Sequence, residues 1–298
     1  MAEGTARRAA RRPGYWRDAF LRGLLFAILG LFVLYYLLPL FVMVVTSLKS
    51  LEEIRLGSLV ALPKEVTFAP WREAWSSACT GVECYGLKPY FMNSVMMVIP
   101  AVLLSTLLGA VNGYTLSKWR FPGANIIFGL LLFGCFIPFQ VVLLPMARTL
   151  GILGLAGSIW GLVLVHVIYG IGFTTLFFRN YYITVPDELV KAAKVDGAGF
   201  FRIFFSIFLP LSPPVFVVTV IWQFTQIWND FLFGVSFSAA DSQPVTVALN
   251  NIVNATTGVK AYNVDMAAAI IAALPTLIVY VVAGKYFVRG LTAGSVKG

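Results

Sequence analysis

The chain has 298 residues, of which 59% are hydrophobic and 12% charged, and its mean hydropathy is +0.85. Soluble domains carry about a quarter charged residues, so this composition excludes a water-soluble globular protein. The apolar residues gather in long runs without charge, which predicts a single membrane domain of spanning helices.

A basic segment precedes the first apolar run. It contributes six arginines to the formal net charge of +9: Arg7, Arg8, Arg11, Arg12, Arg17 and Arg22. One interpretation of such a tail is an arm that binds nucleic acid. A juxtamembrane segment that holds the N-terminus in the cytoplasm is far commoner, so we favour it and expect no nucleic-acid partner.

Six apolar runs follow, each of about 20 residues and long enough to cross ~30 Å of hydrocarbon. They lie near Leu24–Leu48, Phe91–Leu116, Ala124–Ala147, Gly157–Phe178, Pro213–Asn229 and Met266–Gly284. No small-residue cleavage site follows the first run, so we expect it to be retained rather than removed as a signal peptide. The sequence predicts an all-α integral membrane protein, with a six-span domain over residues 24–288 between tails 1–23 and 289–298.

The basic residues predict how these spans are oriented. Of the 22 lysines and arginines, 15 fall in segments that this topology places inside and seven in segments that it places outside. Because basic residues accumulate on the cytoplasmic side, we expect both termini to be cytoplasmic. Two outer loops, near Lys49–Tyr90 and Gly234–Val264, are long and mostly polar, which favours contact with an extracytoplasmic partner.

The inner connection between the fourth and fifth spans is the most informative loop. A capping hydroxyl at Thr184, followed by Pro186 and two acidic residues, predicts a helix that runs to about Val195. Gly197 can adopt the left-handed conformation that ends such a helix. Residues 199–208 then form a second short helix, which we expect to stop at the prolines that follow.

The first loop helix has a face suited to close contact. Leu189, Ala192 and Ala193 are predicted to share it, and the two alanines would let another surface approach closely. Charged residues flank this face: Glu188, Lys191 and Lys194. The helix either lies on lipid headgroups, as amphipathic surface helices do, or docks on another protein, and these residues alone favour neither.

The loop resembles a known family. Residues 191–198 read Lys-Ala-Ala-Lys-Val-Asp-Gly-Ala, and nine residues separate Gly197 from Ile207-Phe208-Leu209-Pro210. This pattern resembles the cytoplasmic EAA loop of ABC importer permeases. Four other stretches resemble the sugar branch of that family: Asn93-Ser94, Pro138-Phe139-Gln140, Trp228-Asn229-Asp230 and Arg289 to Gly298. Lys191 stands where the family usually has glutamate, so an ion pair from that glutamate to the ATPase is not carried over.

The resemblance, which covers nearly all of the chain after about residue 24, implies the type I ABC importer permease fold in the inner membrane. It implies a maltose-type second permease that pairs with a homologous permease and two ATP-hydrolysing subunits, and receives sugar from an extracytoplasmic binding protein. The loop at 179–210 would couple it to the ATPase. The expected coupling residues are Glu188, Leu189, Lys191, Ala192, Ala193, Asp196, Gly197, Ala198, Ile207, Leu209 and Pro210. Outer stretches at 242–250 and 262–266, with the loop at 79–84, resemble glucose and mannose importers.

Other classes of function fit the sequence less well. It has no phosphate-binding loop of the G-x-x-x-x-G-K-S/T type, so we expect ATP and magnesium on partner subunits and no cofactor on this chain. No acidic or basic residue lies in the middle of a predicted span, which disfavours the alternative of an ion-coupled transporter or channel working without an ATPase. A membrane enzyme would need a convergent nucleophile and base or a metal site, and we find neither.

Polar residues within the spans are candidates for a sugar path. The ones we single out are Gln140, Gln223, Gln226 and Asn229. The last three, with Trp222, lie near one stripe of the fifth span and offer amides and an aromatic face. Each could instead join helices by hydrogen bonds, and in the maltose-type complex the sugar contacts come mainly from the partner permease. For His166 we expect an interhelical hydrogen bond rather than a metal site.

Three cysteines remain. Cys79 and Cys84 lie in the first outer loop with C-x4-C spacing, and outside the cytoplasm such a pair either oxidises or stays as two thiols. We favour the disulfide. Zinc is disfavoured because the loop has no histidine and lacks two further ligands, so we expect no metal. Cys135 in the third span is interpreted as a small buried apolar side chain.

Overall fold

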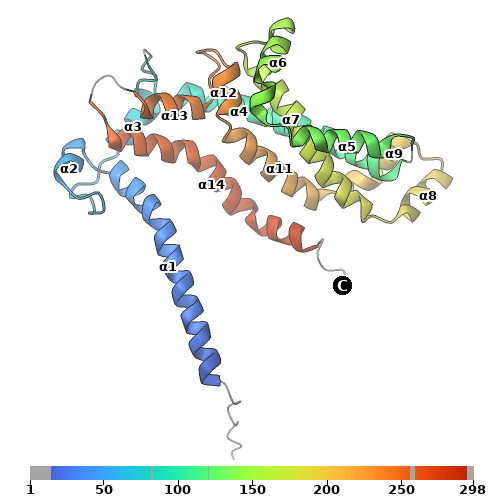
Figure 1. Cartoon of the computed structure of the whole chain (residues 1–298), viewed down its shortest axis with the longest axis horizontal. Helices are drawn as coiled ribbons and strands as arrows, with labels where there is room; N and C mark the ends of the chain where they lie inside the picture. The colour runs from blue at the N-terminus through green and yellow to red at the C-terminus, as the bar shows by residue number, and fades with distance from the viewer. Residues whose placement is uncertain (1–14, 82, 120, 256–258, 294–298) are drawn as a thin grey trace, which may run out of the picture.

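The computed structural model describes residues 15–81, 83–119, 121–255 and 259–293, so most of the predicted basic tail and the last five residues lie outside it. The described chain is helical, and it forms an elongated body from which one helix stands apart (Figure 1). The elements are α1 (Tyr15–Ser47), α2 (Leu51–Leu56), α3 (Ala69–Ser76), α4 (Lys88–Lys118), α5 (Ala124–Cys135), α6 (Phe139–Ile152), α7 (Ile159–Ile183), α8 (Asp187–Val195), α9 (Phe200–Ile203), η1 (Phe204–Phe208), α10 (Leu209–Leu211), α11 (Pro213–Trp228), α12 (Leu232–Phe237), α13 (Val245–Val253) and α14 (Tyr262–Ala293).

All six predicted apolar runs correspond to helices. Four helices, α1, α4, α7 and α14, are each long and apolar enough to cross a membrane. Two bent pairs pass the same test together, with an angle of 102° between α5 and α6 and of 80° between residues 200–211 and α11. The described chain therefore has four spans, or up to six if each bent pair is one span.

The apolar run predicted near Ala124–Ala147 is not one straight helix. The chain turns sharply after Cys135, and α6 starts only at Phe139. Pro138 precedes α6 with an extended ψ of 128°. Proline lacks an amide hydrogen and disfavours helical backbone in the residue before it, which favours the break at this point.

Glycines bring α4 and α7 into close contact at the centre of the body. Gly109 and Gly113 have the G-x-x-x-G spacing of closely packed membrane helices. A Cβ atom added to Gly109 would lie 2.5 Å from Cβ of Thr174, and one added to Gly113 would lie 2.6 Å from Cβ of Phe178. The Thr174 hydroxyl also donates to the carbonyl of Ser105 at 2.9 Å. These two helices form one packed unit. The segment before α13 contacts one end of α4, and α8 contacts the other.

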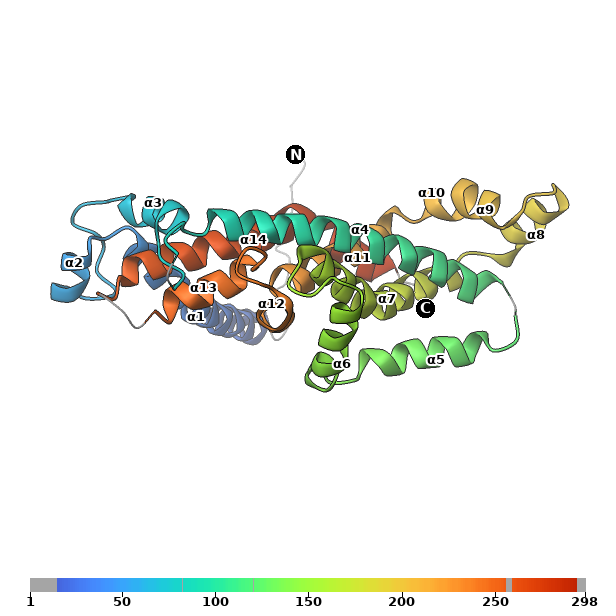
Figure 2. The same cartoon turned by 90° about the horizontal axis from the view of Figure 1, so that it is seen from above.

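The start of α4 holds the segment that leads into α13. The Asn93 amide donates to the carbonyls of Asp241 at 2.8 Å and Gln243 at 3.1 Å. The Ser94 hydroxyl accepts from the backbone N–H of Val245 at 2.9 Å. Seen from above, α2 and α3 lie at one end of the body and α8 to α10 at the other (Figure 2). The predicted outer loops and the predicted coupling loop are thus far apart.

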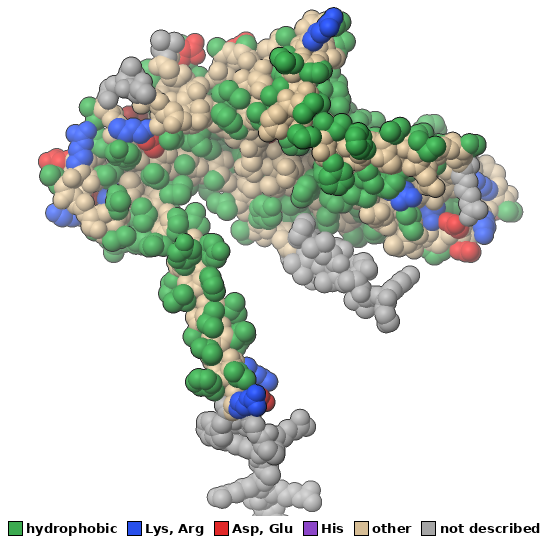
Figure 3. Space-filling model, viewed as in Figure 1, with side chains coloured by type: hydrophobic (Ala, Val, Ile, Leu, Met, Phe, Trp, Pro, Cys, Tyr) green, Lys and Arg blue, Asp and Glu red, His purple; other side chains and the backbone are tan. Residues whose placement is uncertain are grey.

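Most of the first helix has little contact with the rest of the described chain, although its C-terminal residues Val45, Thr46 and Ser47 are buried. Only 6% of its most apolar window is buried, and α1 extends away from the body with hydrophobic side chains over its visible face (Figure 3). Its C-terminal end is attached, because the Asn263 amide donates to the carbonyl of Lys49 at 3.0 Å. In a membrane, lipid tails or another chain must cover this surface.

Candidate coupling loop and transmembrane cavity

The loop after α7 has the predicted order of helix, turn and helix. The first helix, α8, ends at Val195 as predicted, and Gly197 has a φ of +77°. A backbone with this φ favours glycine because a Cβ would be strained. The turn is closed by backbone hydrogen bonds from Gly197 to Lys194 at 3.0 Å and from Ala198 to Ala193 at 2.9 Å.

Two predicted boundaries of this loop differ from the structure. Thr184 does not cap α8: it lies at the end of α7, where its hydroxyl donates to the Tyr181 carbonyl at 2.7 Å. Pro186 takes the cap position instead, and α8 begins after it. The second helix does not stop at Leu209-Pro210, the first of the two predicted stops, but it ends just before the second, Pro213-Pro214. Helical backbone continues to Leu211, because Pro210 falls in the first turn of α10, where the missing amide hydrogen is tolerated.

The last residues of α4 hold both ends of α8. The Lys118 ammonium donates to the carbonyl of Val185 at 2.5 Å and to Oδ1 of Asp187 at 2.6 Å, and its side chain is only 3% exposed. At the other end of α8, the Lys194 ammonium lies 4.1 Å from the centroid of the Trp119 ring, a cation–π contact. Consecutive residues of α4 therefore fix the position of this helix.

A hydrophobic cluster attaches the loop to α4, α7 and α11. Tyr114 is fully buried in it, and its hydroxyl donates to the Phe200 carbonyl at 3.3 Å. The cluster consists of Ala110, Tyr114, Phe178, Tyr182, Val185, Val190, Ile203, Phe204, Phe208 and Val215. It joins α4, α7, α8, α9, η1 and α11. A displacement of α8 would therefore also move the membrane-spanning helices α4, α7 and α11.

The predicted common face of α8 is exposed at Leu189 and Ala192 but partly covered at Ala193. Val190 is buried and Ala193 half-buried against the chain's own cluster, because positions i and i+3 lie on the same side of a helix. Leu189 and Ala192 point away, together with Val195, which is 88% exposed. The surface free to contact a partner is therefore formed by Leu189, Ala192 and Val195 and does not include Ala193.

The other expected coupling residues lie on α8, in the turn after it, and in η1 and α10. Lys191 and Glu188 are both about three-quarters exposed, with Nζ and Oε1 4.0 Å apart. Asp196 and Pro210 are exposed, whereas Ala198, Ile207 and Leu209 are half-buried. The unusual Lys191 is thus at the rim of the helix rather than buried, where its charge stays in water.

A small cavity of about 90 Å³ lies between α7 and α11. Its lining consists of Cys135, Phe139, His166, Tyr169, Gly170, Phe173, Trp222, Gln223, Gln226, Ile227, Asp230 and Phe233. Of the four predicted path residues it contains Gln223 and Gln226. Gln140 and Asn229 do not line it, and Asn229 donates to the Thr225 carbonyl of its own helix at 2.9 Å.

Two polar groups in this cavity have different surroundings. The Gln223 amide donates to the Ser105 hydroxyl at 2.8 Å, so this glutamine joins α11 to α4. His166 is 6% exposed, yet its Nε2 makes no hydrogen bond with the described residues and lies 3.7 Å from Oδ2 of Asp230. The interhelical hydrogen bond expected for His166 is therefore not formed at Nε2 with any described residue. Cys135 also lines the cavity and is half-buried rather than buried.

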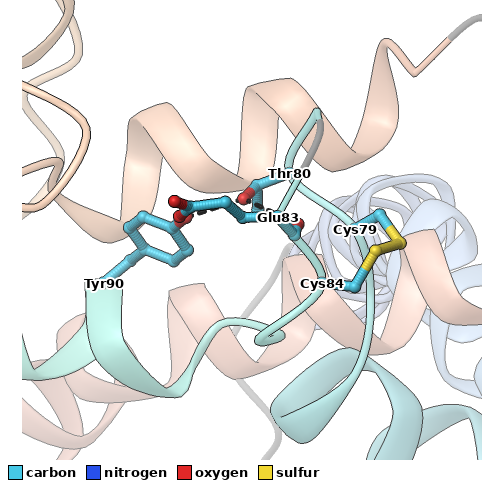
Figure 4. Close-up of a disulfide and its surroundings, with 5 residues drawn as sticks. All are labelled: Cys79, Thr80, Glu83, Cys84 and Tyr90. Carbon is cyan, nitrogen blue, oxygen red and sulfur yellow. Dashed lines mark hydrogen bonds between the residues drawn. A yellow bond between two sulfur atoms is a disulfide. The ribbon is translucent and has the colours of Figure 1, made fainter.

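The first outer loop contains a cysteine pair at bonding distance. The sulfur atoms of Cys79 and Cys84 lie 1.96 Å apart (Figure 4). Within the ring so formed, the Thr80 hydroxyl is hydrogen-bonded to the Tyr90 hydroxyl in the first turn of α4 at 2.7 Å. Among the described residues, no group of three or more His, Cys, Asp and Glu side chains could hold a metal ion.

Residues 90–292 match the model of one protein family, the binding-protein-dependent transport system inner membrane component. The chain belongs to this family. It is a multi-pass subunit of the inner membrane, and its family is one of ABC transporter permeases, which serve transport. The matched residues include the loop at 179–210, the lining of the cavity and nearly all of the chain from α4 to α14.

Similar proteins cover most of this permease. A probable ABC transporter permease protein of Pyrococcus horikoshii is 42% identical over 278 residues, which are 93% of this chain and 98% of the relative. A xylose/arabinose import permease of Haloferax volcanii is 34% identical over 89% of this chain and 90% of its own. A glucose import system permease of Saccharolobus solfataricus is 30% identical over 88% of this chain and 91% of its own.

The fold also matches solved structures. A chain from a bacterial ABC transporter that imports the acidic polysaccharide alginate superimposes with a TM-score of 0.79 at 22% identity, over 92% of this chain and 99% of that one. At this identity the similarity shows the fold alone. It agrees with the ABC importer permease fold expected from the sequence.

Proposed function

We propose that this permease is a subunit of an ATP-driven sugar importer, and that its sugar is glucose or mannose. The observation that carries the proposal is the helix α8, fixed at both ends by Lys118 and Trp119 and presenting Leu189, Ala192 and Val195 outward. A short apolar ridge held this firmly is suited to transmit force from a partner.

The proposal includes a set of partners. A second, homologous permease would complete the translocation path, and two ATP-binding cassette subunits would hold ATP and magnesium and hydrolyse the nucleotide. An extracytoplasmic binding protein would deliver the sugar to the outer loops. This chain would bind no cofactor and perform no catalysis, and its own part is transport.

Coupling would proceed through the loop at 179–210. The ridge of α8 would fit a groove on one ATPase subunit, so that closing of the ATPase dimer moves α8 and, through Lys118, α4. The Tyr182 hydroxyl, hydrogen-bonded to Ser212 at 2.7 Å, joins the end of α7 to the start of α11. The spans would then switch between outward- and inward-facing arrangements, which is transport by alternating access.

Similar proteins support a sugar as the cargo but differ in which one. The relatives named for glucose import and for xylose/arabinose import are 30% and 34% identical to this chain. Our preference for glucose or mannose rests on the outer stretches at 242–250 and 262–266. Because these lie in the predicted receptor-facing loops, they would reflect which binding protein docks.

The test is reconstitution of the native complex. We expect the chain to purify from native membranes with an ATPase, a second permease and a binding protein whose retained sugar, identified by mass spectrometry, is D-glucose or D-mannose. Proteoliposomes should then take up that sugar only when ATP and the binding protein are both present. ATP-independent uptake by this chain alone would contradict the proposal and support a secondary transporter.

A further inference from the structure

We propose that the second part of the coupling loop, formed by α9 and η1, lies in the headgroup region of the cytoplasmic leaflet and anchors the loop to lipid. The proposed function gives α8 a protein partner and assigns none to α9 and η1. Four residues of this second part are exposed: Phe201, Arg202, Phe205 and Ser206. We call them the anchor face.

The opposite side of α9 and η1 is part of the chain's own core. Ile203, Phe204 and Phe208 are at most 2% exposed, within the hydrophobic cluster that holds the loop. On the anchor face, Phe201 is 67% exposed and Phe205 is 58% exposed. Residues four apart lie on the same side of a helix, so these two rings form one apolar surface. Something outside this chain must cover it.

The angle of the segment indicates that the membrane covers this surface. Residues 200–211 are bent by 80° from α11, so they run close to the membrane plane when α11 crosses it. The helix α11 has 16 residues and is therefore ~24 Å long, which is shorter than the ~30 Å of hydrocarbon in a bilayer. A helix ~10 Å thick that lies across the cytoplasmic end of α11 completes this distance.

Two hydrogen bonds fix the depth of the segment. The Tyr181 hydroxyl donates to the Leu211 carbonyl at 2.6 Å, and the Tyr182 hydroxyl is hydrogen-bonded to the Ser212 hydroxyl at 2.7 Å. Both tyrosines belong to the last turn of α7, the span that leads into the loop. The segment is thus held where α7 ends and α11 begins, which is the boundary between hydrocarbon and cytoplasm.

Arg202 gives the anchor face a charge that suits lipid. Its side chain is exposed and forms no ion pair with any residue that the structure describes. A guanidinium group can bind a phosphate through two parallel hydrogen bonds, and the cytoplasmic leaflet carries anionic lipids. Helices that lie in the membrane interface combine such basic residues with phenylalanine. We therefore assign lipid phosphates to Arg202 and the adjoining acyl region to Phe201 and Phe205.

Spin-label accessibility separates lipid, protein and water as the cover of the anchor face. Phe205→Cys and, on α8, Val195→Cys each receive a nitroxide label in a Cys135→Ser background, which removes the free cysteine. Each variant is placed in nanodiscs of phosphatidylethanolamine and phosphatidylglycerol, both as the full chain alone and as the complex with its ATPase. Oxygen concentrates in lipid and a neutral nickel chelate in water, so relaxation of the label by each agent identifies its surroundings.

We expect the label at position 205 to be severalfold more accessible to oxygen than to the nickel chelate, in both preparations. The label at position 195 should be accessible to the chelate in the chain alone and to neither agent in the complex. If position 205 becomes inaccessible to both agents in the complex, the anchor face contacts the ATPase and the lipid anchor is wrong. Preferential access of the chelate to position 205 would place this face in water and overturn the anchor as well.

Arg202→Gln tests the charge of the anchor face. Replacing phosphatidylglycerol with phosphatidylcholine should lower the oxygen-to-chelate ratio at position 205 severalfold when Arg202 is present. Arg202→Gln should remove this dependence on lipid, and Lys191→Gln on α8 should retain it. The assignment of phosphates to Arg202 is refuted if the ratio is the same in both lipid mixtures. Because none of these measurements requires transport, they can fail while the proposed sugar import holds, and the reverse.

Discussion

Neighbouring residues of α8 differ in burial. The buried ones stabilise the fold of the loop, and the exposed ones are free to contact a partner. Val190 is buried and Ala193 half-buried in the chain's own cluster, whereas Leu189, Ala192 and Val195 are exposed. Substitutions at Ala193 would disturb the loop itself. Only the outward residues can report on a partner without first altering the fold.

We predict that Ala192→Asp lowers ATPase stimulation by the sugar-loaded binding protein by about tenfold, equivalent to about 1.4 kcal/mol. The new carboxylate would have to lose water on docking, which is costly without a partner charge. Lys191→Ala is the matched control on the same helix, and it should change stimulation by less than about twofold because surface charges contribute little. Full stimulation with Ala192→Asp would return α8 to the interpretation of a helix lying on lipid.

Gly197 allows a second comparison at the residue scale. Its φ of +77° would be strained by about 1–2 kcal/mol with a side chain, whereas Gly199, two residues on, has an ordinary φ of −80°. We predict that Gly197→Leu abolishes uptake with normal membrane insertion and that Gly199→Leu retains most of it. Uptake in vesicles, normalised to inserted protein, is the measurement, and equal uptake by both variants would refute the role of the turn.

Among the elements, α4 and α7 depend most on small residues. An added Cβ at Gly113 would lie 2.6 Å from the backbone nitrogen of Arg179. Real Cβ atoms do not approach backbone this closely, so the helices would have to separate. The G-x-x-x-G spacing is visible in the sequence alone, because it is a known pattern of membrane helix contacts.

We predict that Gly113→Leu destabilises the purified protein by about 1–3 kcal/mol, as overpacking usually does. Gly129→Leu on α5 is the control, since nothing lies within 4 Å of a Cβ added there. Thermal unfolding in detergent, followed by tryptophan fluorescence, should show a lower Tm for Gly113→Leu alone. An unchanged Tm would mean that α4 and α7 are less closely packed than the structure indicates.

Local features of the molecule were predictable, and features that depend on distant residues were not. The apolar runs, the end of α8 and the turn at Gly197 follow from short-range rules. The break at Pro138 does not follow from the proline alone, because Pro39, Pro100, Pro145 and Pro275 lie within helices. The faces of α8 and the cavity could not be predicted, because they depend on contacts such as that between Gln223 and Ser105, which are 118 residues apart.

The orientation of the whole molecule can be tested at the cysteine pair. The sulfurs of Cys79 and Cys84 lie at bonding distance in the predicted outer loop. We predict that a membrane-impermeant thiol reagent labels them in intact cells only after reduction. Labelling without reductant would mean free thiols. If neither cysteine can be labelled from outside, even with the loop reduced and denatured, the predicted topology is wrong.

The helix α4 extends from the predicted outer loops to the predicted coupling loop. One end binds the segment before α13 through Asn93 and Ser94, and the other binds α8 through Lys118. If this helix links binding-protein docking to the ATPase, thermodynamics fixes a relation between the two events. The factor by which the docked binding protein tightens nucleotide binding must equal the factor by which nucleotide tightens the binding protein. Weakening either end of α4 would reduce both factors by the same amount.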